Sequence, residues 1–174
     1  TLSLANTPKS GGVHLIRYMF NQKPGRRQNM SEGNLRTGSC LCGSVQVEVP
    51  NNLVDLGVCH CSKCKKWAGG PLMEIECGTA VNFVGKENIT VFKSSEWAVR
   101  GFCQKCGSHL FIRDEKSGEY GIPPGLFDDD ENISLNRQVF FDHKPKYYSF
   151  SNTTKNITSD YIYKHFPQTK ESNT

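Results

Sequence analysis

Short apolar-rich stretches separated by polar and turn residues recur through most of the chain. Residues 45–49, with valine at every second position, show the alternation that is typical of a strand with one buried face. Further strands are predicted over residues 53–58, 72–77, 81–84, 89–92, 96–102, 109–113, 120–122 and 139–141. Residues 62–67 are expected to form one helical turn, and residues 159–165 a helix. Many short strands with little helix predict an all-β fold.

Domain boundaries follow the change in this pattern. Residues 1–36 show no steady hydrophobic period and contain prolines and glycines, so we expect an N-terminal extension that is flexible or non-native. One domain is predicted over residues 37–166, because neither an internal repeat nor a second composition divides it. Residues 167–174 are expected to form a C-terminal tail.

Length and charge narrow the class of protein. The chain has 174 residues, enough for one domain with a sizeable core, and a formal net charge of +4. Because this charge is modest and only Lys23, Arg26 and Arg27 form a basic cluster, nucleic acid is the least favoured partner. No apolar run reaches the roughly 20 residues of a membrane span, and no secretory segment is recognisable. We therefore expect a cytoplasmic protein with no membrane partner.

Cysteine spacing carries the strongest chemical signal. Eight cysteines in 174 residues fall below the roughly 8–10% typical of disulfide scaffolds. Seven of them occur in C-x-C or C-x-x-C groups: Cys40, Cys42, Cys59, Cys61, Cys64, Cys103 and Cys106. This spacing favours metal binding in a reducing compartment over disulfides or a redox C-x-x-C pair. Cys77 stands alone in an apolar stretch and is expected to be a buried core residue.

The spacing leaves open which cysteines share an ion. In one arrangement, the cysteine pair of residues 61–64 joins the pair of residues 103–106 in a zinc ribbon, and three cysteines are left over. In the other, the pair of residues 40–42 joins the pair of residues 103–106 in a closed four-thiolate site. The cysteines of residues 59–64 then form an open three-thiolate site. We prefer the second arrangement, because it places all seven clustered cysteines in two sites.

Three cysteine motifs carry a resemblance to a known family. They are G-S-C-L-C-G at residues 38–43, C-H-C-S-K-C-K-K at residues 59–66 and R-G-F-C-Q-K-C-G-S at residues 100–108, with later matches at residues 125–129 and 139–148. Together they resemble the glutathione-dependent formaldehyde-activating enzymes, a family that includes the centromere protein V group. The resemblance implies a fold of the β-tent type and two zinc ions. It places a structural zinc at Cys40, Cys42, Cys103 and Cys106, and a zinc with an exchangeable ligand at Cys59, Cys61 and Cys64.

An open three-thiolate zinc suits thiol chemistry. Its net negative charge makes it a weak Lewis acid, so we expect it to bind an incoming thiol and hold it as a nucleophilic thiolate. The resemblance implies glutathione as the thiol and formaldehyde as the aldehyde, joined to S-(hydroxymethyl)glutathione by a carbon–sulfur lyase. Cys59, Cys61 and Cys64 would then be catalytic as well as metal-binding.

Glutathione carries two carboxylates, so a cationic rim is expected around the open site. The candidate binding residues are Lys63, Lys65, Trp67 and Arg100, and Lys66 and Lys105 are further cationic candidates. Each lysine could equally be a solvated surface charge, and Arg100 could pair with the aspartates of residues 128–129. His60 lies between two candidate ligands and is expected to point away from the metal, whereas His109 and His143 are expected to be structural.

A second function stays open, that of a zinc-stabilised binding or interaction module without catalysis. It predicts that replacing Cys59 lowers the stability only modestly and removes no catalytic turnover, whereas replacing Cys103 unfolds the domain. An enzyme predicts adduct formation above the uncatalysed rate. The sequence does not indicate the oligomeric state.

Overall fold

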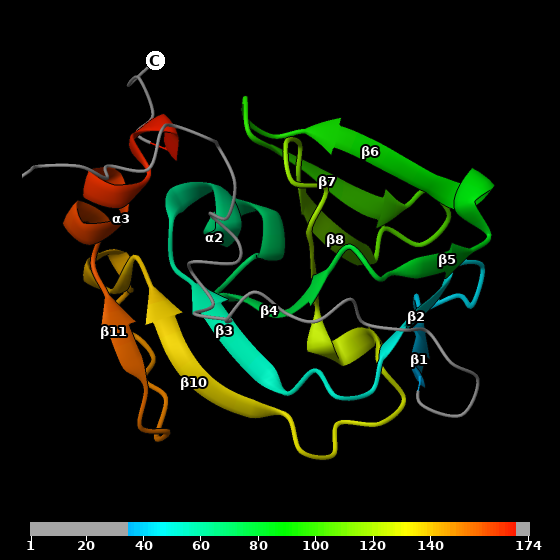
Figure 1. The fold of residues 1–174 in the computed structure, drawn as a ribbon, viewed down its shortest axis with the longest axis horizontal. Coiled ribbons are helices and arrows are strands. Elements are labelled where there is room, and N and C mark those ends of the chain that lie inside the picture. The colour runs from blue at the N-terminus through cyan, green and yellow to red at the C-terminus, as the bar shows by residue number, and fades with distance from the viewer. Residues whose placement is uncertain (1–34, 170–174) are drawn as a thin grey trace, which may run out of the picture.

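Two β-sheets form the framework of residues 35–169, the part of the chain that this computed structural model describes (Figure 1). The smaller sheet has the strand order β1-β2-β5, with β1 (Leu35–Ser39), β2 (Gln46–Pro50) and β5 (Asn82–Val84). The larger sheet has eight strands in the order β11-β10-β3-β4-β9-β8-β7-β6. Along the chain these are β3 (Asp55–Cys59), β4 (Leu72–Gly78), β6 (Ile89–Lys93), β7 (Ala98–Cys103), β8 (His109–Asp114), β9 (Tyr120–Ile122), β10 (Ser134–Val139) and β11 (Lys155–Ile157).

Short helical segments connect the strands. Helix α2 (Ser62–Ala68) follows β3, and helix α3 (Ser159–His165) follows β11. The 3-10 turns are η1 (Lys86–Asn88), η2 (Pro124–Leu126), η3 (Phe141–His143) and η4 (Pro167–Thr169). Within residues 35–169, neither helix has the length and apolar character that crossing a membrane requires.

Strand β10 has an unusual position, because it pairs in parallel on both sides. Its neighbours are β3 and β11, whereas the other strand pairs are antiparallel. Val139 at the end of β10 lies opposite Cys59 at the end of β3. Parallel strands end at the same edge of a sheet, so the segments that follow β3, β10 and β11 start from one edge.

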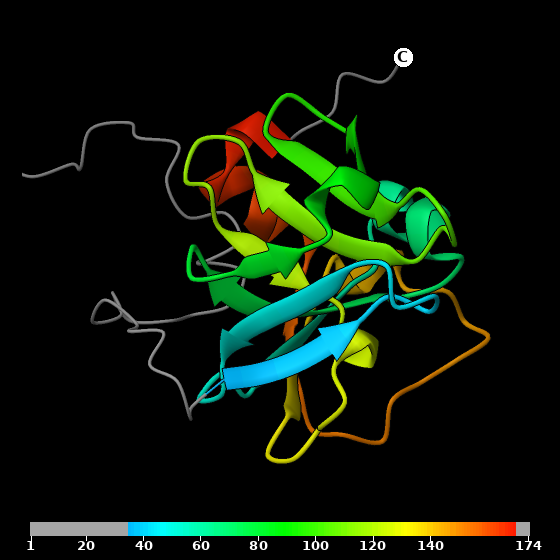
Figure 2. The ribbon, with the colours of Figure 1, turned by 90° about the vertical axis from the view of Figure 1, so that its right-hand side faces the viewer.

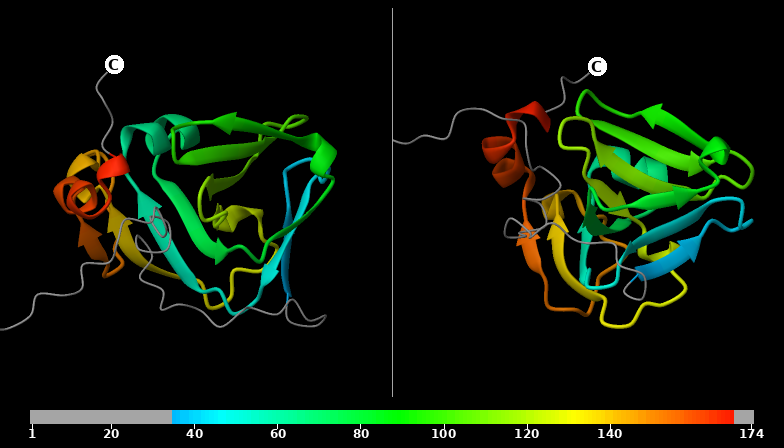
Figure 3. Two further views of the ribbon diagram at one scale, coloured as in Figure 1. Left: turned by 45° about the horizontal axis from the view of Figure 1, so that its top comes forward. Right: turned by 45° about the vertical axis from the view of Figure 1, so that its right-hand side comes forward.

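The views of the ribbon show what gathers at this edge. Figures 1 and 3 place α2 there, with α3 on one side and strands β6 and β7 on the other. Figure 2 looks onto the smaller sheet, which lies on the side of the molecule away from α3. Segments from both halves of the larger sheet therefore flank α2 at this edge.

The buried core has two parts. The larger cluster joins the two sheets and includes Val47 of β2, Phe83 of β5 and Ile122 of β9. The smaller cluster holds α3 against the sheet and consists of Ala98, Ile112, Val139, Phe140, Ile157, Ile162 and Phe166. Cys59 and Cys61 pack against this smaller cluster. Burial of α3 thus fixes the surroundings of two clustered cysteines.

The all-β prediction is confirmed, and the predicted strands before residue 123 lie within two residues of the observed ones. The helix predicted over residues 159–165 is α3. Cys77 is fully buried in the larger cluster, as expected. The predicted extension and tail lie, apart from residues 35–36 and 167–169, outside the described residues.

The strand predicted over residues 139–141 is wrong. Strand β10 covers Ser134–Val139 and ends where Phe140 adopts a left-handed φ of 53°. The hydrophobic pattern did not indicate this strand, because the strand buries polar residues. Strand β10 is paired on both sides and buries Arg137 and Gln138. Strands β1 and β11 were not predicted either, since neither shows a run of apolar alternation.

Candidate functional site

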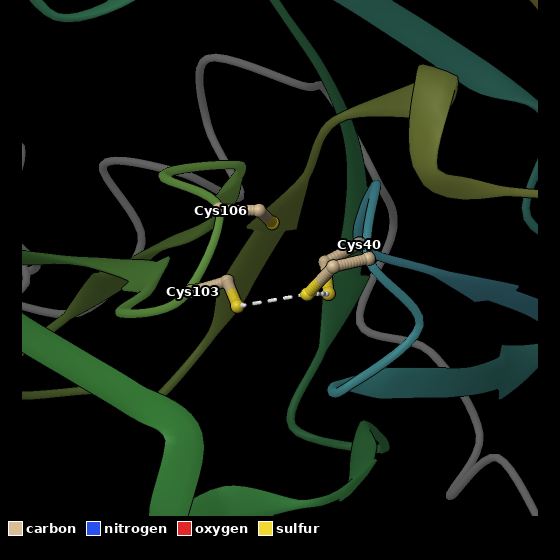
Figure 4. Close-up of side chains that lie close together, drawn as sticks. Cys40, Cys103 and Cys106 are labelled. Atoms are coloured by element: carbon tan, nitrogen blue, oxygen red, sulfur yellow. Dashed lines mark hydrogen bonds between the residues drawn. The ribbon is translucent and has the colours of Figure 1, made fainter.

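Four cysteines from two distant parts of the chain meet between the smaller sheet and the β7–β8 turn. Cys40 and Cys42 follow β1, whereas Cys103 ends β7 and Cys106 lies in the turn before β8. Their sulfur atoms all lie within 4.8 Å of one another. Figure 4 shows Cys40 and Cys103 reaching toward each other from their two loops, with Cys106 alongside. We call these residues the four-cysteine set.

Tight turns hold both halves of this set. Gly43 and Gly107 have left-handed φ angles of 72° and 76°, which glycine adopts at little cost. The N–H of Gly43 donates to the carbonyl of Cys40 over 2.9 Å, and the N–H of Gly107 donates to the carbonyl of Cys103 over 2.8 Å. The N–H of Val45 donates to Cys40 Sγ over 3.3 Å, which orients this sulfur and stabilises its negative charge.

The sulfur spacing of the four-cysteine set fits a zinc ion. A tetrahedral ion with zinc–sulfur bonds of about 2.3 Å separates its sulfurs by about 3.8 Å. Cys42 Sγ lies 3.6 Å from Cys40 Sγ and 3.8 Å from Cys103 Sγ. Hydrogen bonds from Ser108 lower the pKa of Cys106 to about 5, whereas burial raises the pKa of Cys103 to about 11. A cation is therefore needed to hold all four sulfurs as thiolates.

The other three clustered cysteines meet where β3 runs into α2. Cys59 ends β3, Cys61 is the N-cap residue of α2, and Cys64 lies in the first turn of the helix. Cys61 Sγ accepts a hydrogen bond from the N–H of Cys64 over 3.4 Å, in the manner of an N-cap side chain. The three sulfurs lie within 4.8 Å of one another, and no fourth histidine, cysteine or carboxylate of residues 35–169 joins them. We call these residues the three-cysteine set.

The charges of the three-cysteine set also point to a cation. Hydrogen bonds from the thiols of Cys59 and Cys64 lower the pKa of Cys61 well below the ordinary thiol value. Contacts with Cys61 and Cys64, together with burial, raise the pKa of Cys59 well above it. Protein groups alone therefore favour one thiolate here, whereas a divalent metal would hold three. Three protein ligands leave one position of a tetrahedral zinc for an exchangeable ligand.

Arg100 reaches the three-cysteine set from β7. Its Nη2 donates a hydrogen bond to Cys64 Sγ over 3.4 Å, and its guanidinium carbon lies 5.7 Å from the centre of the Trp67 ring. Burial lowers the pKa of Arg100, but its interactions with Cys64, this hydrogen bond among them, and with Glu74 outweigh burial and raise the pKa above its ordinary value. The guanidinium therefore bonds a cysteine sulfur, and not the aspartates of residues 128–129.

A pocket opens over the three-cysteine set. Its apolar walls are Trp97, Ile112, Val139, Phe140 and Tyr163, and its polar lining includes Lys63, Glu74 and Arg100. A second hollow shares Lys63, Ser94 and Arg100 with this pocket and adds Lys66, Trp67 and Phe92. The pocket thus has apolar walls from β8, β10 and α3 and cationic side chains from α2 and β7.

His60 is fully buried behind the three-cysteine set. The amide nitrogen of Gln138 donates to Thr154 Oγ1 over 2.8 Å, so Gln138 Oε1 accepts the Nε2–H of His60 over 2.9 Å. His60 Nδ1 then accepts the hydroxyl proton of Tyr148 over 2.8 Å. Burial lowers the pKa of His60, so the ring is neutral at neutral pH. His60 is thus hydrogen-bonded through Nε2 to β10 and through Nδ1 to the segment that follows β10.

The predicted cationic residues lie in different places. Lys63 lines the pocket and the second hollow, and Lys66 lines the second hollow. Lys65 Nζ donates to the carbonyl of His143 over 2.8 Å, which ties α2 to η3. Lys105 lies in the turn of the four-cysteine set. The structure therefore brings only part of the expected rim to the three-cysteine set.

Glu74, Phe140 and Tyr163 are among the pocket residues that sequence reasoning missed. Glu74 had a detectable signal, because it is a carboxylate inside the apolar stretch of residues 72–77. Phe140 and Tyr163 had none, since they reach the pocket only through the parallel pairing of β10 with β3 and the packing of α3.

The fold and the two cysteine sets define an all-β protein with two sites that could each hold a metal ion. Residues 35–143 match the family described as glutathione-dependent formaldehyde-activating enzyme. This match covers more than half of the chain, and the chain belongs to this family.

Individual relatives differ in how much of their length the chain covers. An uncharacterised lyase of Schizosaccharomyces pombe is 34% identical over 128 residues, which are 73% of this chain and 93% of that protein. A protein of Aspergillus flavus, provisionally named a glutathione-dependent formaldehyde-activating enzyme, is 34% identical over 98 residues. That alignment covers 50% of this chain and 47% of the relative, so the chain spans about half of the relative's length. A crystal structure of a Rhodobacter sphaeroides protein has 28% identity and a TM-score of 0.46, covering 53% of this chain and 87% of that one.

Proposed function

We propose that this protein forms and cleaves the carbon–sulfur bond between a thiol and an aldehyde, with glutathione and formaldehyde as the pair to test first. The observation that carries the proposal is the three-cysteine set, whose sulfurs line a pocket and supply one ligand fewer than a tetrahedral zinc takes. The four-cysteine set supplies all four ligands and suits a structural zinc. Membership of the family supports the same assignment.

The residues around the three-cysteine set prepare it for a sulfur nucleophile. When zinc is bound there, it supplies a site that stabilises the thiolate form of an incoming thiol. Arg100 keeps a positive charge against Cys64 and so favours the ionised form of the set. The side chains of Trp97, Phe140 and Tyr163 give the pocket apolar walls, which strengthen the charge interactions inside it. A thiol and an aldehyde held together in this space would react as if at a high effective concentration.

Two lysines are the candidates for holding the carboxylates of glutathione. Lys63 borders both the pocket and the second hollow, and Lys66 borders the second hollow, so a thiol bound at the sulfurs could extend toward both. The rings of Trp67 and Phe92 stack at 6.2 Å there and would contact the peptide backbone of the thiol. Lys65 is a less suitable candidate, because its ammonium is bonded to His143.

The proposal includes a reducing, cytoplasmic compartment. Two sets of cysteines with sulfurs this close would form disulfides in an oxidising compartment and lose their metal ligands.

Adduct formation tests the proposal directly. NMR of the zinc-loaded chain with glutathione and formaldehyde should show S-(hydroxymethyl)glutathione exchanging faster than in the uncatalysed reaction. Cys59→Ser should remove this excess, because it takes one ligand from the open set. Cys77→Ala is the matched control, since it removes a buried thiol outside both sets and should keep the excess rate. A wild-type protein that holds two zinc ions but gives no excess rate would refute the enzyme and leave a zinc-stabilised binding module.

A further inference from the structure

A buried carboxyl group in the pocket wall has no role in the mechanism above. Glu74 lies on β4, is 5% exposed and lines the same pocket as the three-cysteine set. None of the described residues makes a hydrogen bond to its Oε1. A buried carboxyl group with an unpartnered oxygen beside a pocket is suited to bond a group that enters the pocket.

The sheet makes room for this carboxyl group. A Cβ atom on Gly121 of β9 would lie 3.0 Å from Glu74 Oε2 and 3.1 Å from its carboxyl carbon. Gly121 would also press on Ile112 if it carried a side chain. The absence of a side chain at residue 121 therefore lets the Glu74 carboxyl group lie against β9 at the pocket wall.

Burial keeps Glu74 in the protonated form at neutral pH. Burial raises the pKa of Glu74 to about 8, Arg100 of β7 opposes this shift, and the thiolate of Cys61 at the start of α2 adds to it. Arg100 also has a buried nitrogen, Nη1, and none of the described residues accepts a hydrogen bond from it. Glu74 and Arg100, which both line the pocket, thus each hold one donor at neutral pH that no described residue uses.

We propose that Glu74 is the general acid of the thiol–aldehyde reaction and donates a proton to the aldehyde oxygen, with Arg100 Nη1 as a second donor to that oxygen. This inference rests on the proposed function. Two donors aimed at the oxygen on which negative charge develops are the arrangement that stabilises such a charge in acyl-transfer enzymes.

The proposed step is balanced without an oxidant or reductant. The thiolate sulfur gives an electron pair to the carbonyl carbon, so the carbon–sulfur bond forms and the carbon–oxygen π bond breaks. The electron pair of that bond moves to oxygen, which takes the proton of Glu74. The carboxylate left on Glu74 then takes the proton of the next thiol as that thiol ionises. In the reverse direction, Glu74 removes the hydroxyl proton as the carbon–sulfur bond breaks.

Glu74→Gln in the full zinc-loaded chain tests this assignment, because the amide keeps the size of the side chain and loses the acid. We expect kcat to fall about 100-fold or more, while the affinity for glutathione measured by calorimetry and the zinc content stay unchanged. Glu76→Gln is the matched control, since Glu76 is 3% exposed on the same strand and does not line the pocket. It should keep the wild-type kcat per folded molecule.

The pH profile gives a second readout that a structural role would not move. Wild-type kcat should fall as pH rises through about 8, where Glu74 loses its proton. Glu74→Asp should keep this fall at a lower kcat, and Glu74→Gln should lack it. A kcat of Glu74→Gln within threefold of wild type would overturn the proposal. If neither variant folds, a wild-type kcat that stays flat from pH 7 to pH 9.5 would overturn it. Absence of turnover in the wild type would instead refute the proposed function.

Discussion

Arg100 Nη2 donates a hydrogen bond to Cys64 Sγ over 3.4 Å, and both side chains are buried. This contact joins β7 of one half of the larger sheet to α2 at the edge of the other half. A charged donor to a metal-binding sulfur stabilises its thiolate and fixes its direction. The three-cysteine set therefore depends on a residue that is 36 positions away in sequence.

Replacing Arg100 is expected to weaken metal binding at one set only. Arg100→Met keeps much of the packing and removes the hydrogen bond to Cys64, so the affinity of the three-cysteine set for zinc should fall about 10- to 100-fold. Competition with a chromophoric chelator measures this loss, and the four-cysteine set should keep its ion. Arg113→Met, on the neighbouring strand β8, is the control, because Arg113 contacts Tyr120 and Glu115 and neither cysteine set. Equal affinities for wild type and Arg100→Met would contradict the prediction.

The two cysteine sets should differ in their effect on stability. Cys103 completes a site that ties the smaller sheet to the β7–β8 turn, so Cys103→Ser should lower the Tm by roughly 10 °C or more. Cys59→Ser affects a site within one local segment, and we expect a much smaller loss of Tm. Thermal unfolding followed by circular dichroism, with zinc counted per chain, measures both. Equal losses would assign a structural role to both sets.

The hydroxyl of Tyr148 is expected to stabilise the fold through His60. Tyr148→Phe leaves the buried His60 Nδ1 without a donor, so the free energy of unfolding should fall by about 1–2 kcal/mol. Denaturant unfolding would show this as a lower midpoint at an unchanged slope. Tyr147→Phe is the matched control, because Tyr147 is 80% exposed, and its loss should stay within about 0.5 kcal/mol. If Tyr148→Phe loses no more unfolding free energy than Tyr147→Phe, the buried hydrogen bond contributes nothing to stability.

Glu74 should make stability depend on pH in a specific direction. Its pKa is raised from the ordinary 4.5 to about 8, so between these pH values the folded protein keeps a proton that the unfolded chain releases. The stabilising contribution present below pH 4.5 is then lost as pH rises through about 8. Wild type should therefore lose stability relative to Glu74→Gln between pH 6 and pH 9, as measured by urea unfolding at fixed zinc. A stability difference that does not change with pH would show that Glu74 titrates normally.

Local patterns predicted much of the fold, because most strands are short apolar stretches bounded by turn residues. Residues 45–49 alternate and residues 109–113 contain a short apolar run, and both are strands within a residue of the predicted ends. The pattern failed at residues 134–139, where β10 is paired on both sides and buries polar side chains that bond across the sheet. Such burial is decided by partners far along the chain, which no local window contains.

By itself, the sequence determined that seven cysteines would lie in tight turns with spacings that suit metal ions, since C-x-C and C-x-x-C groups bring sulfurs together within one loop. Only the tertiary structure decided which loops meet. The smaller sheet carries Cys40 and Cys42 to the β7–β8 turn, and the parallel pairing of β10 with β3 brings Phe140 to Cys59. The position of Glu74 beside Arg100 was decided in the same way, because a strand pattern shows which residues are buried but not which pocket they border.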